Sequence, residues 1–199
     1  MNNFIQQIEV LSREELKTVN EYIDTLDFQP NKIFGADGEA RVDNSIRSSL
    51  GASMTDGETA TDLIHNKLNQ GLEKYKQIII NELDVALDSY PVPGAYMTTS
   101  HREGIQVLEY SKEQKYSWHF DSATDPNTRF YHRQISIVLY LSEDFDGGST
   151  VFRTGKYKPK AGTALFFPSN WCFPHSSEPV ISGKKRVAVT WYYCTDLCV

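Results

Sequence analysis

Apolar residues recur at helical spacing in two stretches of the first half of the chain. In the first stretch, Ser12 and Glu15 have the spacing of a capping box, and apolar residues follow at intervals of three and four. This pattern predicts a helix over 13–26. The same spacing, continued for longer, predicts a second helix over 61–87, with Gly71 as a candidate interruption. Residues 28–59 show no period, which indicates an irregular loop and a candidate lid over a site.

Strand character begins after Pro91 and Pro93, which a helix cannot accommodate. From residue 104 onward, short segments rich in β-branched and aromatic residues alternate with Gly, Pro, Asp or Ser. These segments are "GIQVLEY", "YSWHFD", "RQISIVLYLS", "STVFRT", "GTALFFPS" and "KRVAVTWYY". They predict an antiparallel sandwich or barrel. We therefore expect an α+β fold with a mainly β core, as one domain over 1–199: supporting helices to about residue 90, and the β core over about 91–195.

Composition and charge narrow the function classes. The chain is 40% hydrophobic and 12% aromatic, as in folded globular proteins, and its net charge of -6 argues against a nucleic-acid or anionic-membrane partner. No apolar run has the length of a membrane span, and the N-terminus lacks a basic region followed by an apolar one, so we expect a cytoplasmic protein. Cys172, Cys194 and Cys198 lack zinc or redox spacing, and we expect reduced thiols. A disulfide between Cys194 and Cys198 stays open.

A histidine and an aspartate two residues apart provide the first candidate chemistry. On a strand, His119 and Asp121 point to the same face. Taken alone, such a pair could equally form a hydrogen bond at the protein surface instead of binding a metal. His175, which follows the strand "GTALFFPS", would complete a set of two histidines and one carboxylate, which leaves open positions on iron(II). With a divalent ion this set has a net charge of +1, which suits an anionic co-substrate.

A basic residue near His175 is a candidate anchor for that co-substrate. Lys185 stands at the start of the strand "KRVAVTWYY", with Val187, Val189 and Trp191 on the same face. This pattern indicates a cation inside an apolar pocket. The alternative is a solvated basic turn formed by residues 184–186.

Five motifs in this order resemble the iron(II)- and 2-oxoglutarate-dependent dioxygenases, in particular the prolyl 4-hydroxylase-like branch. They are "RSS" at 47–49, "VLEYSKEQKYSWHFD", "IVLYLSEDFDGGSTVF", "PKAGTALFFPS" and "HSSEPVISGKKRVAVTW". The resemblance covers residues 43–193. It implies a double-stranded β-helix, also called a jelly roll or cupin-like fold, with iron held between its two sheets.

The resemblance also implies roles for particular residues. Its iron ligands fall on His119, Asp121 and His175, and the cation that pairs with the 5-carboxylate of 2-oxoglutarate falls on Lys185, with Arg186 as the alternative.

Five aromatic residues and one turn have further candidate roles. Tyr140 matches a tyrosine that also meets the 5-carboxylate, and Tyr110 one near the 1-carboxylate or the substrate, with a plain core role open for both. Trp118, Trp191 and Phe166 are candidate pocket walls or core residues. We expect the turn at residues 146–148 to be structural.

The implied reaction is hydroxylation of an unactivated C–H bond, with O2 consumed and 2-oxoglutarate decarboxylated to succinate. The branch points to prolyl 4-hydroxylation of a peptide or protein, with ascorbate as a reductant. Asp121 argues against the halogenating relatives, and Trp191 against the nucleic-acid dealkylating ones. Hydroxylation of a free amino acid or other small metabolite stays open, and a metal-binding β-sandwich without oxygenase activity is the distant alternative. The oligomeric state stays open, and the short stand-alone domain indicates a bacterial or viral protein.

Overall fold

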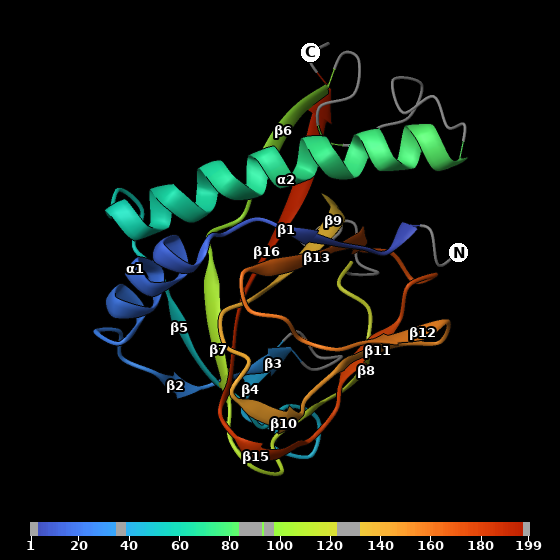
Figure 1. Ribbon diagram of the computed structural model, residues 1–199. Coiled ribbons are helices and arrows are strands. Elements are labelled where there is room, and N and C mark those ends of the chain that lie inside the picture. The colour runs from blue at the N-terminus through green and yellow to red at the C-terminus, as the bar shows by residue number, and fades with distance from the viewer. Residues whose placement is uncertain (1–3, 35–38, 84–92, 94–97, 123–131, 197–199) are drawn as a thin grey trace.

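Two β-sheets face each other, and two helices cover the outer face of the larger one (Figure 1). The structure is a computed structural model and describes residues 4–34, 39–83, 93, 98–122 and 132–196. The main sheet has the order β1-β13-β9-β16-β7-β5-β2, with β6 paired to β16. Its strands are β1 (Gln6–Glu9), β2 (Gln29–Pro30), β5 (Leu50–Ser53), β6 (Thr98–Arg102), β7 (Gln106–Tyr110), β9 (Arg133–Tyr140), β13 (Thr163–Pro168) and β16 (Lys185–Asp196). The predicted sandwich is therefore confirmed.

The smaller sheet has the order β12-β11-β14-β8. Its strands are β8 (Tyr116–His119), β11 (Thr150–Phe152), β12 (Gly155–Tyr157) and β14 (His175–Ser177). Two further pairs are β3 (Ile33–Phe34) with β4 (Ala40–Arg41), and β10 (Phe145–Gly147) with β15 (Val180–Gly183). Residues 146–148 form the expected tight turn at the end of β10, since Gly147 and Gly148 have positive φ angles of 76° and 63°.

The helices begin close to where the pattern predicts. Helix α1 (Arg13–Ile23) has the full capping box, in which Ser12 accepts from the Glu15 backbone and Glu15 accepts from the Ser12 backbone. It ends three residues before the predicted 26. Helix α2 (Thr59–Leu83) runs through Gly71 without a break, so the predicted interruption is wrong. The predicted extension to residue 87 lies outside the described residues.

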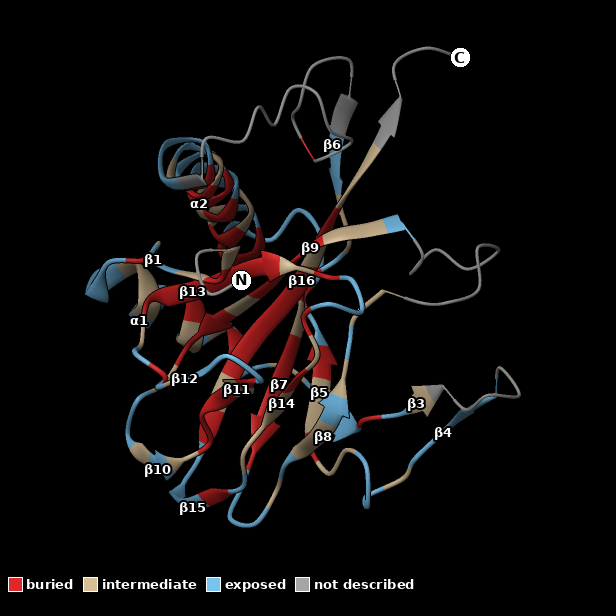
Figure 2. Ribbon diagram, turned by 90° about the vertical axis from the view of Figure 1, so that its right-hand side faces the viewer, coloured by how far each residue is buried: buried red, intermediate tan, exposed pale blue. Residues whose placement is uncertain are grey.

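Strand alternation divides the interior into two cores. One lies between the main sheet and the helices and includes Ala188 and Tyr192 of β16. The other lies between the two sheets and includes Val187 and Val189 of the same strand. Figure 2 shows the buried strands β13, β9, β16 and β7 at the centre, whereas β3 and β4 project from the body. Lys185 therefore shares a face with the inter-sheet core.

Several short strands have no counterpart in the sequence prediction. The region 28–59, predicted to be irregular, contains β2 to β5, and β1 precedes the first helix. The segment 46–48 also lies along β8, where Ser117 donates from its backbone to Ile46 and Ser48 to Lys115. Cys172 is a free thiol, and Cys198, and with it the open Cys194–Cys198 disulfide, lies outside the described residues. Within the described ranges, no helix has the length and apolarity of a membrane span.

Gly71 is retained in α2 because Phe166 of β13 packs against it. A Cβ added at Gly71 would lie 2.6 Å from Cζ of Phe166 and 3.0 Å from a methyl group of Val10. We expect Gly71→Ala to lower the free energy of unfolding by about 1 kcal/mol, because overpacking of about 1–3 kcal/mol exceeds the gain of about 1 kcal/mol in helix propensity. Urea unfolding measures this, with Gln70→Ala on the exposed face as the control. A Gly71→Ala protein more stable than the wild type would contradict this packing.

Candidate metal centre

Two neighbouring strands bring the candidate histidines together. His119 at the end of β8 and His175 at the start of β14 are directly paired across the antiparallel ladder. Asp121 follows β8 by two residues, and its backbone N–H donates to the carbonyl of Ser169, just after β13. The predicted strand "GTALFFPS" is therefore not the neighbour of β8, because His175 begins a strand of its own. The three side chains come from two strands and one anchored loop.

The three side chains converge on one point. One ligand atom from each of His119, Asp121 and His175 lies within 4.8 Å of the others. Nε2 of His119 is 3.5 Å from Oδ1 of Asp121, and Nε2 of His175 is 3.8 Å from Oδ2. These are the donor atoms of a two-histidine, one-carboxylate site for a divalent transition metal.

The far nitrogen of each histidine already has a hydrogen-bond partner. Nδ1 of His119 lies 2.8 Å from the Ser117 carbonyl, and Nδ1 of His175 lies 3.2 Å from the Phe173 carbonyl. A carbonyl only accepts, so Nδ1 carries the proton and the Nε2 lone pair faces the cluster. Such contacts to the second nitrogen are typical of metal-binding histidines. The donor set therefore fits a metal ion.

The charge states also suit a metal. Burial and the neighbouring His119 lower the pKa of His175 to about 4, which leaves its imidazole neutral at pH 7. Burial acts to raise the pKa of Asp121, but His175, His119 and the Ser136 hydroxyl outweigh it and hold the pKa well below its usual value. Neutral imidazoles and an ionised carboxylate are the forms that bind metals.

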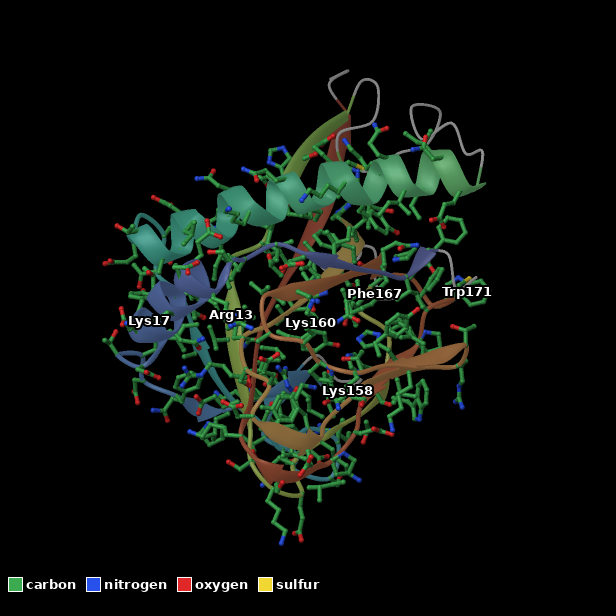
Figure 3. All side chains as sticks on the ribbon, viewed as in Figure 1. Arg13, Lys17, Lys158, Lys160, Phe167 and Trp171 are labelled. Atoms are coloured by element: carbon green, nitrogen blue, oxygen red, sulfur yellow. The ribbon has the colours of Figure 1, made fainter. Side chains whose placement is uncertain are left out.

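Aromatic side chains fix the two imidazole rings. The Tyr116 ring stacks on His119 with centroids 3.7 Å apart, and the Arg47 guanidinium lies 4.9 Å from the centroid of Tyr116. Phe167, which points inward from β13 in Figure 3, meets the ring of His175 edge-on at 4.8 Å. The imidazoles are thereby held before any ligand arrives.

A cavity of about 950 Å³ opens from the cluster, and Lys185 lies in its wall. The side chain is buried, and Nζ donates to the Gly148 carbonyl at 2.7 Å and to the Ser177 hydroxyl at 2.8 Å. Burial lowers the pKa of Lys185 to about 7, against a weaker opposing effect of Glu178. No carboxylate of the described residues forms an ion pair with it. A buried ammonium in this state favours an anionic ligand.

Arg186 points to the other face of β16, as strand alternation requires. Its guanidinium donates to Glu109 at 2.6 Å and pairs with Asp24 of the α1 C-terminus at 2.8 Å. It lines a separate groove beside α1. The structure therefore brings Lys185 into the cavity and leaves the alternative residue, Arg186, outside it.

The two candidate tyrosines have different surroundings. Tyr110 lines the cavity, with its ring 5.1 Å from Nζ of Lys185, and burial raises the pKa of its phenol. The hydroxyl of Tyr140 lies 2.8 Å from Oγ1 of Thr150, and it is Thr150 that belongs to the cavity wall. Contact of Tyr140 with a co-substrate stays a prediction; in the structure its buried hydroxyl pairs with the Thr150 hydroxyl.

Of the three candidate wall residues, the structure places one in the cavity. Trp191 lines it, and the Arg133 guanidinium lies 3.5 Å from the Trp191 ring centroid. Trp118 is 44% exposed and stacks under Arg153 instead. Phe166 belongs to the core beneath α2, where it stacks on Tyr75. The wall predictions for Trp118 and Phe166 are therefore wrong, because alternation turns each side chain to the opposite face.

Two serines at the site are absent from the sequence prediction. Ser136 donates to Oδ2 of Asp121 at 2.6 Å, and the hydroxyls of Ser136 and Ser169 lie 2.8 Å apart. Both residues are 1% exposed. The available signal was a lone serine inside the apolar strand "QISIVLYL", since a buried hydroxyl requires a partner.

Comparison with known proteins finds similarity to one enzyme family. Residues 105–193 match the 2OG-Fe(II) oxygenase superfamily. Probable prolyl 4-hydroxylase 4 of Arabidopsis thaliana is 27% identical over 181 residues, and prolyl 4-hydroxylase 2 of the same plant 26% over 182. Each alignment covers 75% of this chain and 59% of the relative. The chain therefore spans about three-fifths of the length of these curated relatives.

Solved structures share the fold over nearly the whole chain. A viral collagen prolyl hydroxylase from Paramecium Bursaria Chlorella virus-1, as its 2OG complex, has a TM-score of 0.66 at 22% identity and covers 95% of both chains. A Trichoplax adhaerens prolyl hydroxylase, in complex with a hypoxia inducible factor peptide fragment, has a TM-score of 0.66 at 20% identity, covering 96% of this chain and 84% of that one. The predicted jelly-roll fold is confirmed.

Residues 105–193, the β-rich part of this chain, are similar to the 2OG-Fe(II) oxygenase superfamily. Within it, the similarity is to the prolyl 4-hydroxylase-like branch, as the sequence motifs predicted. Iron(II), 2-oxoglutarate and O2 are the cofactor and co-substrates that this family implies.

Proposed function

We propose that this protein is an iron(II)- and 2-oxoglutarate-dependent dioxygenase that hydroxylates proline in a peptide or protein. The observation that carries the proposal is one cavity with the His119, Asp121 and His175 cluster and, in its wall, the buried ammonium of Lys185. The cluster offers donors for iron(II), and the ammonium offers charge to a dicarboxylate. When bound, the iron would supply the O2 chemistry that protein side chains lack.

One set of cavity residues would bind iron, and a second set would bind the co-substrate. His119, Asp121 and His175 would bind iron(II), and Lys185 with the Thr150 hydroxyl would bind the distal carboxylate of 2-oxoglutarate. Tyr140 would act through Thr150, and Tyr110 would pack beside Lys185. The residues that line the cavity are spread along the chain between Lys32 and Tyr193. This spread supports residues 1–199 acting as one catalytic domain.

The open side of the cavity supports a peptide substrate. Ile46 and Phe120 line it and are each 38% exposed, so the cavity reaches the surface beside the segment 46–48. A closed pocket would instead have favoured a free amino acid. Two relatives are named prolyl 4-hydroxylases, and a fold neighbour is described in complex with a peptide.

Peptide hydroxylation coupled to succinate formation tests this function. With iron(II), 2-oxoglutarate and ascorbate as reductant, the protein should add one oxygen atom to a proline of a proline-rich peptide, as seen by mass spectrometry, with one succinate formed per hydroxylation. The same peptide with every proline replaced by alanine is the control. Succinate formed equally with both peptides, or hydroxylation of free proline alone, would contradict a peptidyl-proline substrate.

Proton uptake reports whether Lys185 meets the co-substrate. The pKa of Lys185 is about 7 in the fold against 10.5 ordinarily, so at pH 8 most of its amine is neutral, whereas an adjacent carboxylate favours the charged form. Binding of 2-oxoglutarate should therefore take up close to one proton at pH 8 and much less at pH 6. Calorimetry in buffers of different ionisation enthalpy measures it. Equal uptake by Lys185→Met would assign the proton to another group.

The lowered pKa of Lys185 also determines how the free energy of unfolding changes with pH. Because the folded pKa of Lys185 lies below the unfolded one, the unfolded chain binds more protons between pH 7 and 10.5. The contribution of Lys185 to the free energy of unfolding therefore rises with pH across that window. Lys185→Met should flatten this part of the stability profile.

A further inference from the structure

Asp121 offers two oxygens to the cavity, and one of them already has a strong partner. The Ser136 hydroxyl donates to Oδ2 at 2.6 Å, and Oδ2 is also 3.8 Å from Nε2 of His175, whereas Oδ1 is 3.5 Å from Nε2 of His119. A carboxylate can bind a metal through one oxygen or both. The hydrogen bond at Oδ2 therefore bears on how Asp121 binds a metal.

The burial of Ser136 sets its hydroxyl apart from an ordinary core group. It lies on β9, paired in register with Phe167 on one side and Trp191 on the other, and is 1% exposed. A buried hydroxyl among such neighbours is costly unless it is hydrogen-bonded. Its hydrogen-bond partners are Asp121 and Ser169, so both of its contacts lie at the candidate metal centre.

The direction of the hydroxyl chain follows from the charge of Asp121. An ionised carboxylate only accepts, so the single proton of Ser136 goes to Oδ2. The 2.8 Å contact between the two serines then requires Ser169 to donate to Ser136. A chain of this kind, Ser169 to Ser136 to Asp121, strengthens the final hydrogen bond by polarisation.

The backbone of Ser169 ties the same groups together. Its carbonyl accepts the N–H groups of Asp121 and Ser122 at 3.1 and 3.0 Å, and its own N–H donates to Gln134 at 3.0 Å. Ser169 therefore holds the loop of Asp121 through its backbone and the carboxylate through its side chain. It also lies on the segment that leads from β13 to His175.

We propose that Ser136, backed by Ser169, is a positioning residue that reserves Oδ2 of Asp121, so that the carboxylate gives the metal Oδ1 alone. The inference rests on the proposed function for the identity of the metal. Binding through one oxygen leaves one more coordination position for other ligands than binding through two. Neither serine touches the metal or the substrate in this role.

Cobalt(II) titration without 2-oxoglutarate tests this role independently of turnover. In Ser136→Ala the dissociation constant for cobalt(II) should rise by roughly 10–100-fold, the range typical for losing a hydrogen bond to a ligand. The visible bands of the bound ion should also change, because Oδ2 becomes free to coordinate. Ser169→Ala should shift the constant in the same direction by a smaller factor, and it supplies the test should Ser136→Ala fold poorly.

Thr190→Val is the matched control. Thr190 is also 1% exposed and donates to a carbonyl, that of Glu103, at 2.7 Å, so this variant loses a buried hydroxyl away from Asp121. Cobalt(II) affinity and bands should stay as in the wild type. In an Asp121→Ala background, Ser136→Ala should cause no further loss of affinity.

Two failures are distinguishable. If Ser136→Ala and Ser169→Ala bind cobalt(II) as tightly as Thr190→Val and with unchanged bands, the positioning role is overturned while the proposed function stands. If the wild type binds metal through Asp121 with the predicted serine dependence but never binds 2-oxoglutarate, the proposed function fails and the positioning role stands.

Discussion

Replacing His175 by alanine is expected to abolish 2-oxoglutarate turnover while leaving the fold largely intact. The side chain supplies one of three candidate ligands, is 5% exposed, and its Nδ1 is held by the Phe173 carbonyl. Loss of a hydrogen bond to a ligand alone costs about 10–100-fold in metal affinity, so loss of the ligand itself should exceed about 100-fold. Iron(II) binding and succinate formation measure the effect, and circular dichroism checks the fold.

His101→Ala is the control for this substitution. His101 lies on β6, exposed and stacked on Tyr193, outside the metal cluster. We expect this variant to keep wild-type iron affinity and turnover. Iron-dependent activity retained in His175→Ala would rule out His175 as the third ligand.

Lys185→Ala is expected to raise the dissociation constant for 2-oxoglutarate by roughly 30-fold or more. Truncating one partner of a buried, hydrogen-bonded charge pair costs about 2–5 kcal/mol, and every 1.4 kcal/mol is about tenfold in affinity. Lys185 is buried in the cavity wall, where the described residues supply no ion pair. Calorimetric titration of the iron-loaded protein without O2 measures the change.

Arg186→Ala is the neighbouring comparison and should act on stability. Its guanidinium lies 2.6 Å from Glu109, whose side chain is 8% exposed, and Lys184 lies 3.1 Å from the same carboxylate. Because Glu109 keeps Lys184 as a partner, the free energy of unfolding should fall by less than the roughly 3–5 kcal/mol of a buried charge left unpaired. The affinity of the Arg186→Ala protein for 2-oxoglutarate should stay within a few-fold of that of the wild type. The opposite pattern, with Arg186→Ala weakening 2-oxoglutarate binding and Lys185→Ala sparing it, would move the anchor to the other face of β16.

Local spacing explains why the His119 and Asp121 part of the candidate cluster could be predicted from the sequence, whereas His175 was assigned through the family resemblance. His119 and Asp121 are two residues apart near the end of a strand, and alternation also puts Lys185 in line with Val187, Val189 and Trp191. The capping box at Ser12 is likewise contained within four residues. Features of this kind depend on neighbours in the chain, so the pattern alone indicates them.

Features that depend on distant partners were missed or mispredicted. The strand β1 reads "QQIE", with one apolar residue, and forms because it pairs with β13, more than 150 residues further along the chain. The side chain of Gln7 also donates to the hydroxyl of Thr163, 156 residues away. Gly71 was predicted to break the helix, but the glycine is there because the ring of Phe166 leaves no room for a Cβ. Ser136 and Ser169, 33 residues apart, meet only when the sheet is assembled.

An anaerobic titration with iron(II) and then 2-oxoglutarate tests the central claim most directly. If the His119, Asp121 and His175 cluster holds iron that 2-oxoglutarate chelates, a visible charge-transfer band appears in the wild type. The band should vanish in Asp121→Ala and require much more 2-oxoglutarate in Lys185→Ala. Iron binding without a band, or an unchanged band in Asp121→Ala, would contradict the account.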